Sequence, residues 1–162
     1  QCGLFLMDLE RFKNVNDMLG HPMGDALLKI VAQRLARVVG NRGQVGRLGG
    51  DEFIVIVPEA SDPGRLAELA DAVIARLSLP YVIDDCTIQI GATIGIAMAP
   101  SDGTCPDELT RNADLALYAA KAAGKGVHRF YTPEMHREAD ARRAIEGDLR
   151  DVLARGEMSV LY

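Results

Sequence analysis

Apolar and polar positions follow two different periods along the chain, and together they predict a mixture of strands and helices. Short apolar or alternating runs are typical of strands, whereas apolar residues at three- and four-residue steps are typical of amphipathic helices. The pattern predicts strands at residues 2–7, 45–48, 53–57, 81–83, 87–97 and 127–131. It predicts helices at residues 10–20, 23–39, 63–77 and 106–123.

Two pairs of these strands predict β-hairpins, and the hairpins set the fold class. One pair flanks the turn at residues 49–52, and the other pair turns at Asp84-Asp85. In the strand at residues 87–97, isoleucine and alanine alternate with polar residues and glycine, so we expect one apolar face. Hairpins exclude a purely parallel sheet. We therefore expect an α+β fold in which helices flank an antiparallel-rich central sheet.

The character of the chain changes after Tyr131. Thr132-Pro133-Glu134 combines a helix cap, a first-turn proline and an acidic residue, and it predicts the start of a long charged helix. Its thin apolar stripe is typical of a connector between domains rather than of a core helix. We expect one domain over residues 1–131, a connecting helix over residues 132–156, and the incomplete start of a second domain over residues 157–162.

Composition and charge restrict the classes of partner. The apolar share of 48% and the charged share of 25% are ordinary for a globular domain. The net charge of −5 argues against a nucleic acid polymer as partner. Three scattered cysteines favour a reducing cytoplasm, and no apolar run has the length of a membrane span. We expect a cytoplasmic segment without direct membrane contact, from a parent that other domains can anchor to a membrane.

The turn Gly49-Gly50-Asp51-Glu52 carries the first candidate chemistry. Glycines allow the backbone to approach a ligand closely and to adopt positive φ angles. Adjacent carboxylates repel one another, so they are best tolerated where a cation neutralises them. In an extended hairpin Asp51 and Glu52 point to opposite faces, so one can bind a metal while the other handles a proton. The alternative is a solvated turn without a ligand.

Asp8 strengthens the interpretation of the turn as a metal site. A carboxylate that ends a buried strand lies where α/β proteins usually bind ligands. Mg²⁺ is often held by one or two carboxylates together with substrate phosphates, so Asp8 and Asp51 on neighbouring strand ends form a candidate Mg²⁺ site. Mn²⁺ is an alternative occupant. The competing interpretation of Asp8 alone is a helix N-cap.

Two further groups of polar residues admit both a ligand and a structural interpretation. Asn16 and Asp25 flank a Gly-His-Pro turn, and an amide with a carboxylate can recognise the edge of guanine. Taken by themselves, these residues are better explained by helix capping. Lys121 and Lys125 lie one helical turn apart, where they can contact a triphosphate or complement the helix dipole.

In combination, these residues resemble the GGDEF family of diguanylate cyclases over roughly residues 3–131. The matching segments occur in the family's order and are residues 8–13, 16–17, 20–21, 24–25, 47–53 and 119–126. The family implies a fold like the palm of nucleotidyl cyclases and polymerases, with a ferredoxin-like core. Residues 142–162 are similar to the opening of an EAL phosphodiesterase domain. The resemblance therefore implies a piece of a GGDEF–EAL tandem protein, with the EAL domain beginning at residues 157–162.

The resemblance also implies an activity in bacterial second-messenger signalling and a role for each matching residue. Two subunits of a homodimer each bring one GTP, and two condensations release pyrophosphate and yield cyclic di-GMP. The implied Mg²⁺ ligands are Asp8, the Leu9 carbonyl and Asp51, and the implied catalytic residues are Glu52, Asp51 and Arg47. The implied substrate-binding residues are Asn16 and Asp25 at guanine, the Arg11 and Phe12 amides, Lys13, Lys121 and Lys125 at phosphates, and Gly49 and Gly50 in the turn.

Three departures from the family pattern modify these expectations. Gly40 and Gly43 stand where the family has the Arg and Asp of its product-inhibition motif, so we predict no feedback inhibition by that route. Glu10 replaces the usual Asp, and its longer side chain still reaches the metal region. Gln1 leads almost directly into a strand, so we expect a fragment that lacks the family's N-terminal segment.

Three functions remain open on the sequence. The first is a diguanylate cyclase, which the intact Asp51-Glu52 pair favours. The second is a catalytically silent GTP-binding domain that controls an attached EAL phosphodiesterase. The third is a structural dimerisation domain.

Overall fold

The computed structural model describes residues 1–154, with side chains as far as Ile145. The chain divides into two compact units, the first formed by residues 1–131 and the second beginning at Thr132. The elements of the first unit are β1 (Cys2–Glu10), α1 (Phe12–Leu19), α2 (His21–Val39), a 3₁₀ turn η1 (Gly40–Arg42), β2 (Gln44–Gly49), β3 (Glu52–Pro58), α3 (Pro63–Leu77), β4 (Tyr81–Ile83), β5 (Cys86–Ile88), β6 (Gly91–Ala99), α4 (Pro106–Ala122) and β7 (His128–Phe130). The second unit contains α5 (Pro133–Ala154).

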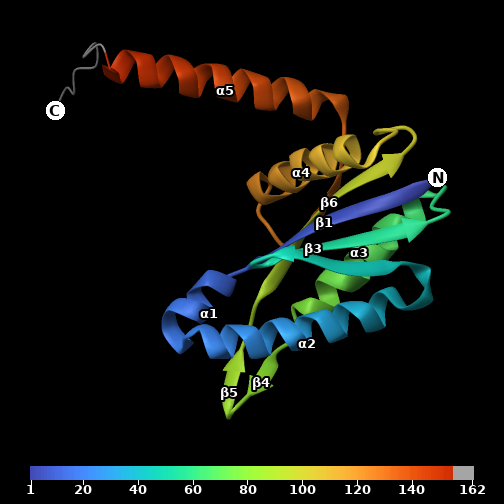
Figure 1. The fold of residues 1–162 in the computed structure, drawn as a ribbon, viewed down its shortest axis with the longest axis vertical. Coiled ribbons are helices and arrows are strands. Elements are labelled where there is room, and N and C mark those ends of the chain that lie inside the picture. Colours follow the sequence, from blue (N-terminus) through green and yellow to red (C-terminus); the bar gives the residue numbers. More distant parts are fainter. Residues whose placement is uncertain (155–162) are drawn as a thin grey trace. The chain divides into compact units, whose positions relative to one another are not determined.

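A five-stranded sheet forms the centre of the first unit, in the order β2-β3-β1-β6-β7 (Figure 1). The pairs β2–β3, β1–β3 and β1–β6 are antiparallel, and β6–β7 is parallel. Helices lie on both faces of this sheet. The predicted α+β fold with an antiparallel-rich central sheet is therefore confirmed.

The single strand predicted at residues 87–97 is wrong, because the chain forms two strands there. β5 pairs only with β4, in a separate two-stranded sheet, and β6 then joins β1 from the pair Gly91 and Glu10 onward. The alternating pattern continues across the break because Ile88 and Ile90 are both buried on either side of Gln89. Hydrophobic periodicity reports burial, and it does not detect a change of pairing partner.

The expected apolar face of this strand is present, and the structure shows that the other face of β6 is buried as well. Ile94 and Ile96 point into the core under α2 and α3, while Thr93, Gly95 and Ala97 lie under α4. The residues on the α4 face are small because α4 packs directly on the strand. A Cβ atom added at Gly95 would lie only 2.8 Å from Leu117 Cα and closer still to the Ala113 carbonyl.

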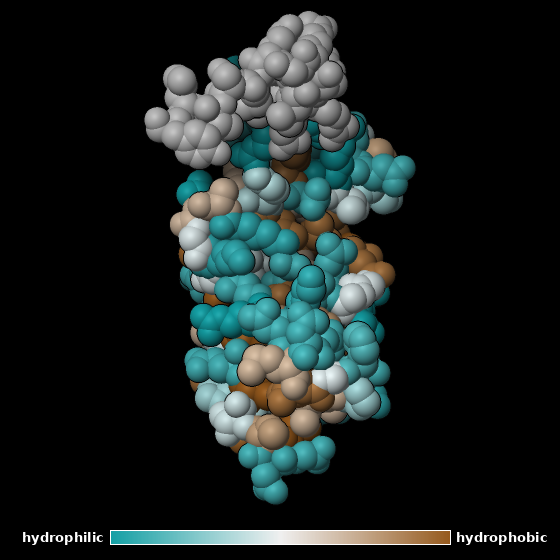
Figure 2. Space-filling model, turned by 90° about the vertical axis from the view of Figure 1, so that its left-hand side faces the viewer, coloured by the Kyte–Doolittle hydropathy of each residue, from teal (hydrophilic) through white to brown (hydrophobic). Residues whose placement is uncertain are grey.

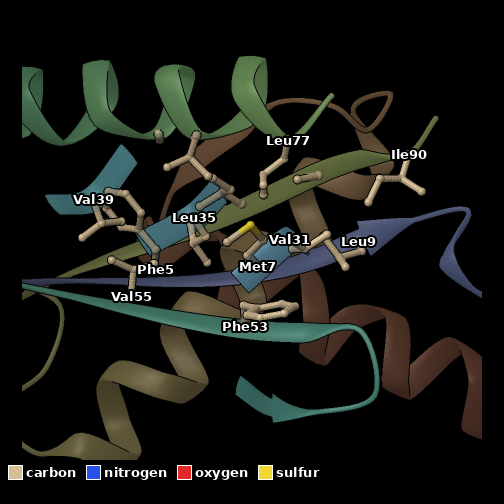
Figure 3. Close-up of a cluster of buried hydrophobic side chains, with 14 of the residues drawn as sticks. Phe5, Met7, Leu9, Val31, Leu35, Val39, Phe53, Val55, Leu77 and Ile90 are labelled. Atoms are coloured by element: carbon tan, nitrogen blue, oxygen red, sulfur yellow. The ribbon is translucent and has the colours of Figure 1, made fainter. Parts of the chain in front are cut away.

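The larger part of the core lies between the sheet and the helices α2 and α3. Large side chains from β1 and β3 meet the apolar faces of the two helices there, as Figure 3 shows for Phe5, Met7, Phe53, Val31 and Leu35. Each of these five side chains is at most 1% exposed. Their burial is the main stabilising contribution to the unit, because removing apolar surface from water contributes roughly 25 cal/mol per Å².

Arg34 closes this core at the end near β4. Its guanidinium lies 3.7 Å from the centroid of the Tyr81 ring and donates hydrogen bonds to the carbonyl oxygens of Leu79 and Pro80, each at 2.7 Å. Burial raises the pKa of the Tyr81 hydroxyl, and the charge of Arg34 partly opposes this effect. The Tyr81 hydroxyl donates to the Leu77 carbonyl at 2.9 Å. The cation and the ring thus join α2 to β4.

The second unit consists of α5 in its described part. The predicted long helix is present from Pro133 to Ala154. The predicted start of a further domain, at residues 157–162, lies outside the described residues. None of the helices in the described part of the chain combines the length and the hydrophobicity that crossing a bilayer requires.

Candidate active site

A row of polar side chains crosses three strands where β1 ends. Asp8 on β1 pairs with Glu52 on β3 and with Thr93 on β6. Side chains directly opposite one another in a sheet lie on the same face, so all three are on the face that α4 partly covers. Thr93 is fully buried, the Asp8 side chain is 18% exposed, and Glu52 is exposed. The row therefore passes from the protein interior to solvent within three strands.

The β2–β3 hairpin holds its two carboxylates at the open end of this row. Gly50 has a φ of 51°, a conformation that favours glycine in a tight turn. The Arg47 guanidinium donates to the Gly50 carbonyl from Nε at 3.0 Å and from Nη2 at 2.8 Å. The Leu9 amide donates to the Asp51 carbonyl at 3.2 Å. The end of β1 and the turn are thus joined through the backbone, and Arg47 lies against its own turn.

Lys121 is in direct contact with Asp8. Its Nζ atom lies 2.6 Å from Asp8 Oδ2, and the Lys121 side chain is 36% exposed. Lys121 lies in the last turn of α4, on the helical face that also carries Leu117 and Ala113. Because this face packs on the sheet, the lysine points toward the row of polar residues rather than toward open solvent.

Glu10 connects the end of β1 to the loop that follows α4. Its Oε1 accepts a hydrogen bond from the Gly126 amide at 2.6 Å and a short one from the Thr93 hydroxyl. The Gly126 amide also lies 3.0 Å from Thr93 Oγ1. This loop contains Lys125, which has a φ of 62° and is exposed. Glu10 therefore holds the segment with both lysines against the sheet, which the sequence interpretation, with Glu10 reaching toward a metal, did not anticipate.

The start of α1 has the geometry of an anion-binding helix terminus. Arg11 has a φ of 64°, and no side chain caps the helix that begins at Phe12. The first amide groups of a helix have no partners within the helix, and the helix dipole favours negative charge there. The Phe12 side chain is buried, which fixes the turn, while Lys13 is exposed beside it.

Asn16 and Asp25 lie where α1 packs on α2. A Cβ atom at Gly24 would collide with Asn16 Oδ1, so the glycine allows the amide to lie directly on α2, one residue from Asp25. Asp25 and Arg47 line a common hollow of about 260 Å³ with residues of α2. The structure thus brings the predicted guanine-reading residues and the hairpin to neighbouring positions.

The donor set fits a divalent cation that shares its coordination with a substrate. Within the described residues, no three or more His, Cys, Asp or Glu side chains form a ready-made metal cluster. Mg²⁺ does not require one, because it commonly takes one or two carboxylates and completes its shell with phosphates and water. Asp8, the Leu9 carbonyl and Asp51 are oxygen donors at two hydrogen-bonded segments, which suits this mode of binding.

Two other hollows lie away from the polar row. One of about 460 Å³ lies between α1 and β5 and is lined mainly by apolar groups, including Val15, Met18 and Ile88. Figure 2 shows apolar surface toward the lower end of the molecule, where these elements lie in Figure 1. The other, of about 740 Å³, is lined by residues of both charge signs near Arg42 and Arg65.

Comparison with known proteins identifies the family. Residues 1–127 match the family model described as diguanylate cyclase, GGDEF domain. The chain is 40% identical over 160 residues to the bifunctional diguanylate cyclase/cyclic di-GMP phosphodiesterase MucR of Pseudomonas aeruginosa, covering 99% of the chain and 23% of MucR. It is 33% identical over 160 residues to the cyclic di-GMP phosphodiesterase NbdA of the same organism, covering 99% of the chain and 20% of NbdA. The chain thus spans about a fifth of the length of these relatives.

Solved structures give the same result. The GGDEF domain of TpbB, also called YfiN, from P. aeruginosa superposes with a TM-score of 0.82 at 34% identity, covering 86% of this chain and 81% of that one. An EAL/GGDEF domain protein from M. capsulatus superposes with a TM-score of 0.77 at 39% identity, covering 82% and 85%. The sheet order, the polar row and these matches lead to one conclusion: the chain belongs to the GGDEF family.

Proposed function

We propose that the chain is a diguanylate cyclase domain, which condenses two GTP molecules into cyclic di-GMP and releases two pyrophosphates. The family match and the diguanylate cyclases among its relatives support this activity. The observation that carries the proposal is the pairing of Asp8 with Glu52 across β1 and β3, with Lys121 on Asp8. Two carboxylates and an ammonium group at one end of the sheet are complementary to a metal–triphosphate complex, because carboxylates attract the metal cation and the ammonium group attracts the phosphates.

Asp8, the Leu9 carbonyl and Asp51 would hold the metal. The family is generally dependent on a divalent metal, and we propose Mg²⁺, with Mn²⁺ as an alternative. When bound, the metal would neutralise charge that develops on the transferred phosphoryl group. Oxygen donors on two hydrogen-bonded segments support this assignment.

Phosphoryl transfer depends mainly on positioning and charge stabilisation. In each condensation, the 3′-oxygen of one GTP forms a bond to the α-phosphorus of the other, and the bond to pyrophosphate breaks. Glu52, exposed beside Asp8, would accept the proton of the attacking hydroxyl. Arg47 would keep the hairpin turn in place through its two hydrogen bonds to Gly50.

The remaining predicted residues would bind the nucleotide. The amides of Arg11 and Phe12 and the side chain of Lys13 would contact phosphates, because the uncapped start of α1 favours an anion. Lys121 and Lys125 would contact the phosphates from the opposite side, and Gly49 and Gly50 would let the turn approach the nucleotide. Asn16 and Asp25 would recognise guanine, which the packing of Asn16 at Gly24, the residue before Asp25, supports.

The reaction needs a second copy of the chain. Each subunit would bring one GTP, and a head-to-tail homodimer would bring the two nucleotides together. For the parent protein we propose a cytoplasmic GGDEF–EAL tandem, with the GGDEF domain over residues 1–131, a connecting helix over residues 132–156 and the EAL domain from residue 157. The EAL/GGDEF protein among the similar structures supports this arrangement.

The test is incubation of the chain with GTP and Mg²⁺, followed by chromatographic separation of the nucleotides. The expected result is cyclic di-GMP and pyrophosphate in a ratio of one to two, with a rate that rises more steeply than linearly with protein concentration. GTP bound without product would contradict the cyclase assignment.

A second candidate function is a catalytically silent GTP-binding domain that regulates an attached EAL phosphodiesterase. The observation behind this candidate is that NbdA, a relative 33% identical over nearly the whole chain, is a cyclic di-GMP phosphodiesterase, whereas the family match and the cyclase relatives favour the first function. The product assay separates the two functions, because the regulatory domain binds GTP and releases no pyrophosphate. Absence of GTP binding would instead favour a structural dimerisation domain.

A further inference from the structure

The carboxylate of Asp8 is paired with the ammonium group of Lys121, at the position where the proposed function needs a divalent metal. Lys121 Nζ lies 2.6 Å from Asp8 Oδ2, and the Asp8 side chain is only 18% exposed. Two cations that share one carboxylate repel each other, and the repulsion is stronger where solvent is partly excluded. A metal at Asp8 and the Lys121 ammonium on the same oxygen are therefore in competition.

The helix that carries Lys121 cannot move away easily to relieve this competition. α4 lies directly on β6 at Gly95, where an added Cβ atom would lie 2.8 Å from Leu117 Cα. Ala120, next to Lys121, is fully buried. The base of the lysine is therefore fixed, and only its flexible four-carbon stem can carry the charge to another partner.

We propose that Lys121 is a resident counter-ion of Asp8, which moves from this carboxylate to the triphosphate when the metal and the nucleotide bind. This inference rests on the proposed function, because it says which cation neutralises Asp8 before and after the metal and the nucleotide bind in the same site. Metal binding to Asp8 frees Lys121 for phosphate, and phosphate binding to Lys121 frees Asp8 for metal. The exchange makes the metal and the nucleotide each strengthen the binding of the other, since thermodynamic coupling is reciprocal.

The proposal predicts that removal of the Lys121 charge strengthens metal binding and weakens GTP binding. The Lys121→Met variant should bind Mn²⁺ in the absence of nucleotide about two- to fivefold more tightly than the wild type, as expected for loss of a partly exposed competing charge. The same variant should bind GTP in the presence of Mg²⁺ about tenfold more weakly, because a charge-assisted contact to phosphate is lost. A lysine that only contacts phosphate, or only complements the helix dipole, predicts no gain in metal affinity.

In the first experiment, the full 162-residue chain is titrated with Mn²⁺ alone, and the electron paramagnetic resonance signal of the free ion measures binding. In a second experiment, binding of GTP in the presence of Mg²⁺ is measured by calorimetry. Lys125→Met is the matched control, because Lys125 lies in the loop just after the helix that carries Lys121, and its side chain makes no ion pair with the described residues. It should weaken GTP binding and leave Mn²⁺ affinity unchanged. Lys121→Arg keeps the positive charge and should retain wild-type Mn²⁺ affinity within about twofold.

A second measurement on the wild-type chain keeps the inference testable if Lys121→Met does not fold. The side-chain ¹³Cε resonance of Lys121, assigned with the Lys121→Arg variant, should shift when saturating Mg²⁺ is added without nucleotide. Equal or weaker Mn²⁺ binding by a folded Lys121→Met variant, or an unchanged Lys121 resonance, would overturn the inference. Failure of the wild type to bind GTP would instead count against the proposed function, because the Mn²⁺ and Mg²⁺ titrations contain no nucleotide.

Discussion

The two faces of the central sheet differ in size, coverage and chemistry. The face under α2 and α3 carries large apolar side chains that are almost completely buried, such as Phe5 and Phe53. The face under α4 carries a smaller cluster around Leu4, Leu6 and Leu117. α4 contacts β1, β6 and β7 and leaves the β2–β3 side of this face uncovered, where Ile56 is 40% exposed.

The same strands therefore provide stability on one face and the residues of the proposed active site on the other. Along β1, Met7 and Leu9 point into the large core, whereas Asp8 and Glu10 point to the α4 face. The incomplete cover of this face leaves room for a ligand at the end of β1. The contrast teaches that a substitution on β1 or its neighbours should affect either folding or turnover, depending on the face.

The largest expected effect is a loss of turnover, caused by a substitution at the proposed site on the α4 face. Asp51→Ala removes a proposed metal ligand, and we expect at least about a 100-fold loss of cyclic di-GMP formation, because metal-held charge stabilisation is a large part of catalysis. The Asp51 side chain is not part of the core, so the thermal midpoint should stay near that of the wild type. Asp114→Ala, on the exposed side of α4, is the control and should retain activity. Undiminished turnover in Asp51→Ala would refute the metal assignment.

The next largest effect is a loss of stability, caused by a substitution on the face under α2 and α3. Leu35→Ala removes a fully buried side chain between α2 and the sheet, and we expect a loss of about 2–5 kcal/mol in the free energy of unfolding in urea. Leu79→Ala, at a side chain that is 44% exposed, is the matched control and should change it by less than about 0.5 kcal/mol. A similar loss in both variants would show that the face under α2 and α3 is not the main source of stability.

A pair of glycines on the α4 face tests the close approach of the helix. Gly95→Ala places a methyl group against the backbone of α4, and we expect a loss of about 1–3 kcal/mol together with reduced turnover, because Lys121 moves with the helix. At Gly46, on the uncovered part of the same face, the only atom within 4 Å is the side-chain methyl carbon Ile54 Cγ2 at 2.9 Å, and no backbone atom lies that close. Gly46→Ala should therefore cost clearly less in urea unfolding. An equal cost at both positions would contradict the difference in coverage.

The smallest expected effect is the absence of feedback inhibition. Gly40 has a φ of 57°, and a Cβ atom at Gly43 would collide with the Ile56 carbonyl, so neither position offers a side chain to a dinucleotide. Added cyclic di-GMP should leave the initial rate of pyrophosphate release unchanged, at concentrations up to those of the substrate. Dinucleotide binding near these glycines, detected by calorimetry, would mean that neighbouring residues replace the missing motif.

The sequence predicts the elements of this fold better than their partners. The apolar periods of α2 and α3 and the hairpin at Gly49–Glu52 are recognisable because burial leaves a direct pattern in the residues. The break between β5 and β6 is not recognisable, since Ile88 and Ile90 keep the alternation of one strand. A pairing partner distant in the chain leaves no periodic signal at the point of change.

The site shows the same limit. Asp8, Asp51 and Glu52 stand out in the sequence because carboxylates beside buried strands are unusual. The contact of Lys121 with Asp8 joins residues more than a hundred positions apart, and the bond from Gly126 to Glu10 involves a backbone amide that has no residue-specific signal. One indication was available for Lys121, because it lies four residues after Leu117 and thus on the apolar face of α4.

The close packing of α4 on Gly95 has a consequence for how fast the Lys121 side chain can change its partner. Because the backbone beneath Lys121 is fixed by contact with β6, exchange of its ammonium between Asp8 and a phosphate requires only rotation about side-chain bonds. Such rotations of partly exposed side chains take picoseconds to nanoseconds, whereas the movements of helices and domains take microseconds or longer. The proposed charge rearrangement is therefore fast on the timescale of helix and domain movement, and it sets no limit on the rate of the proposed reaction.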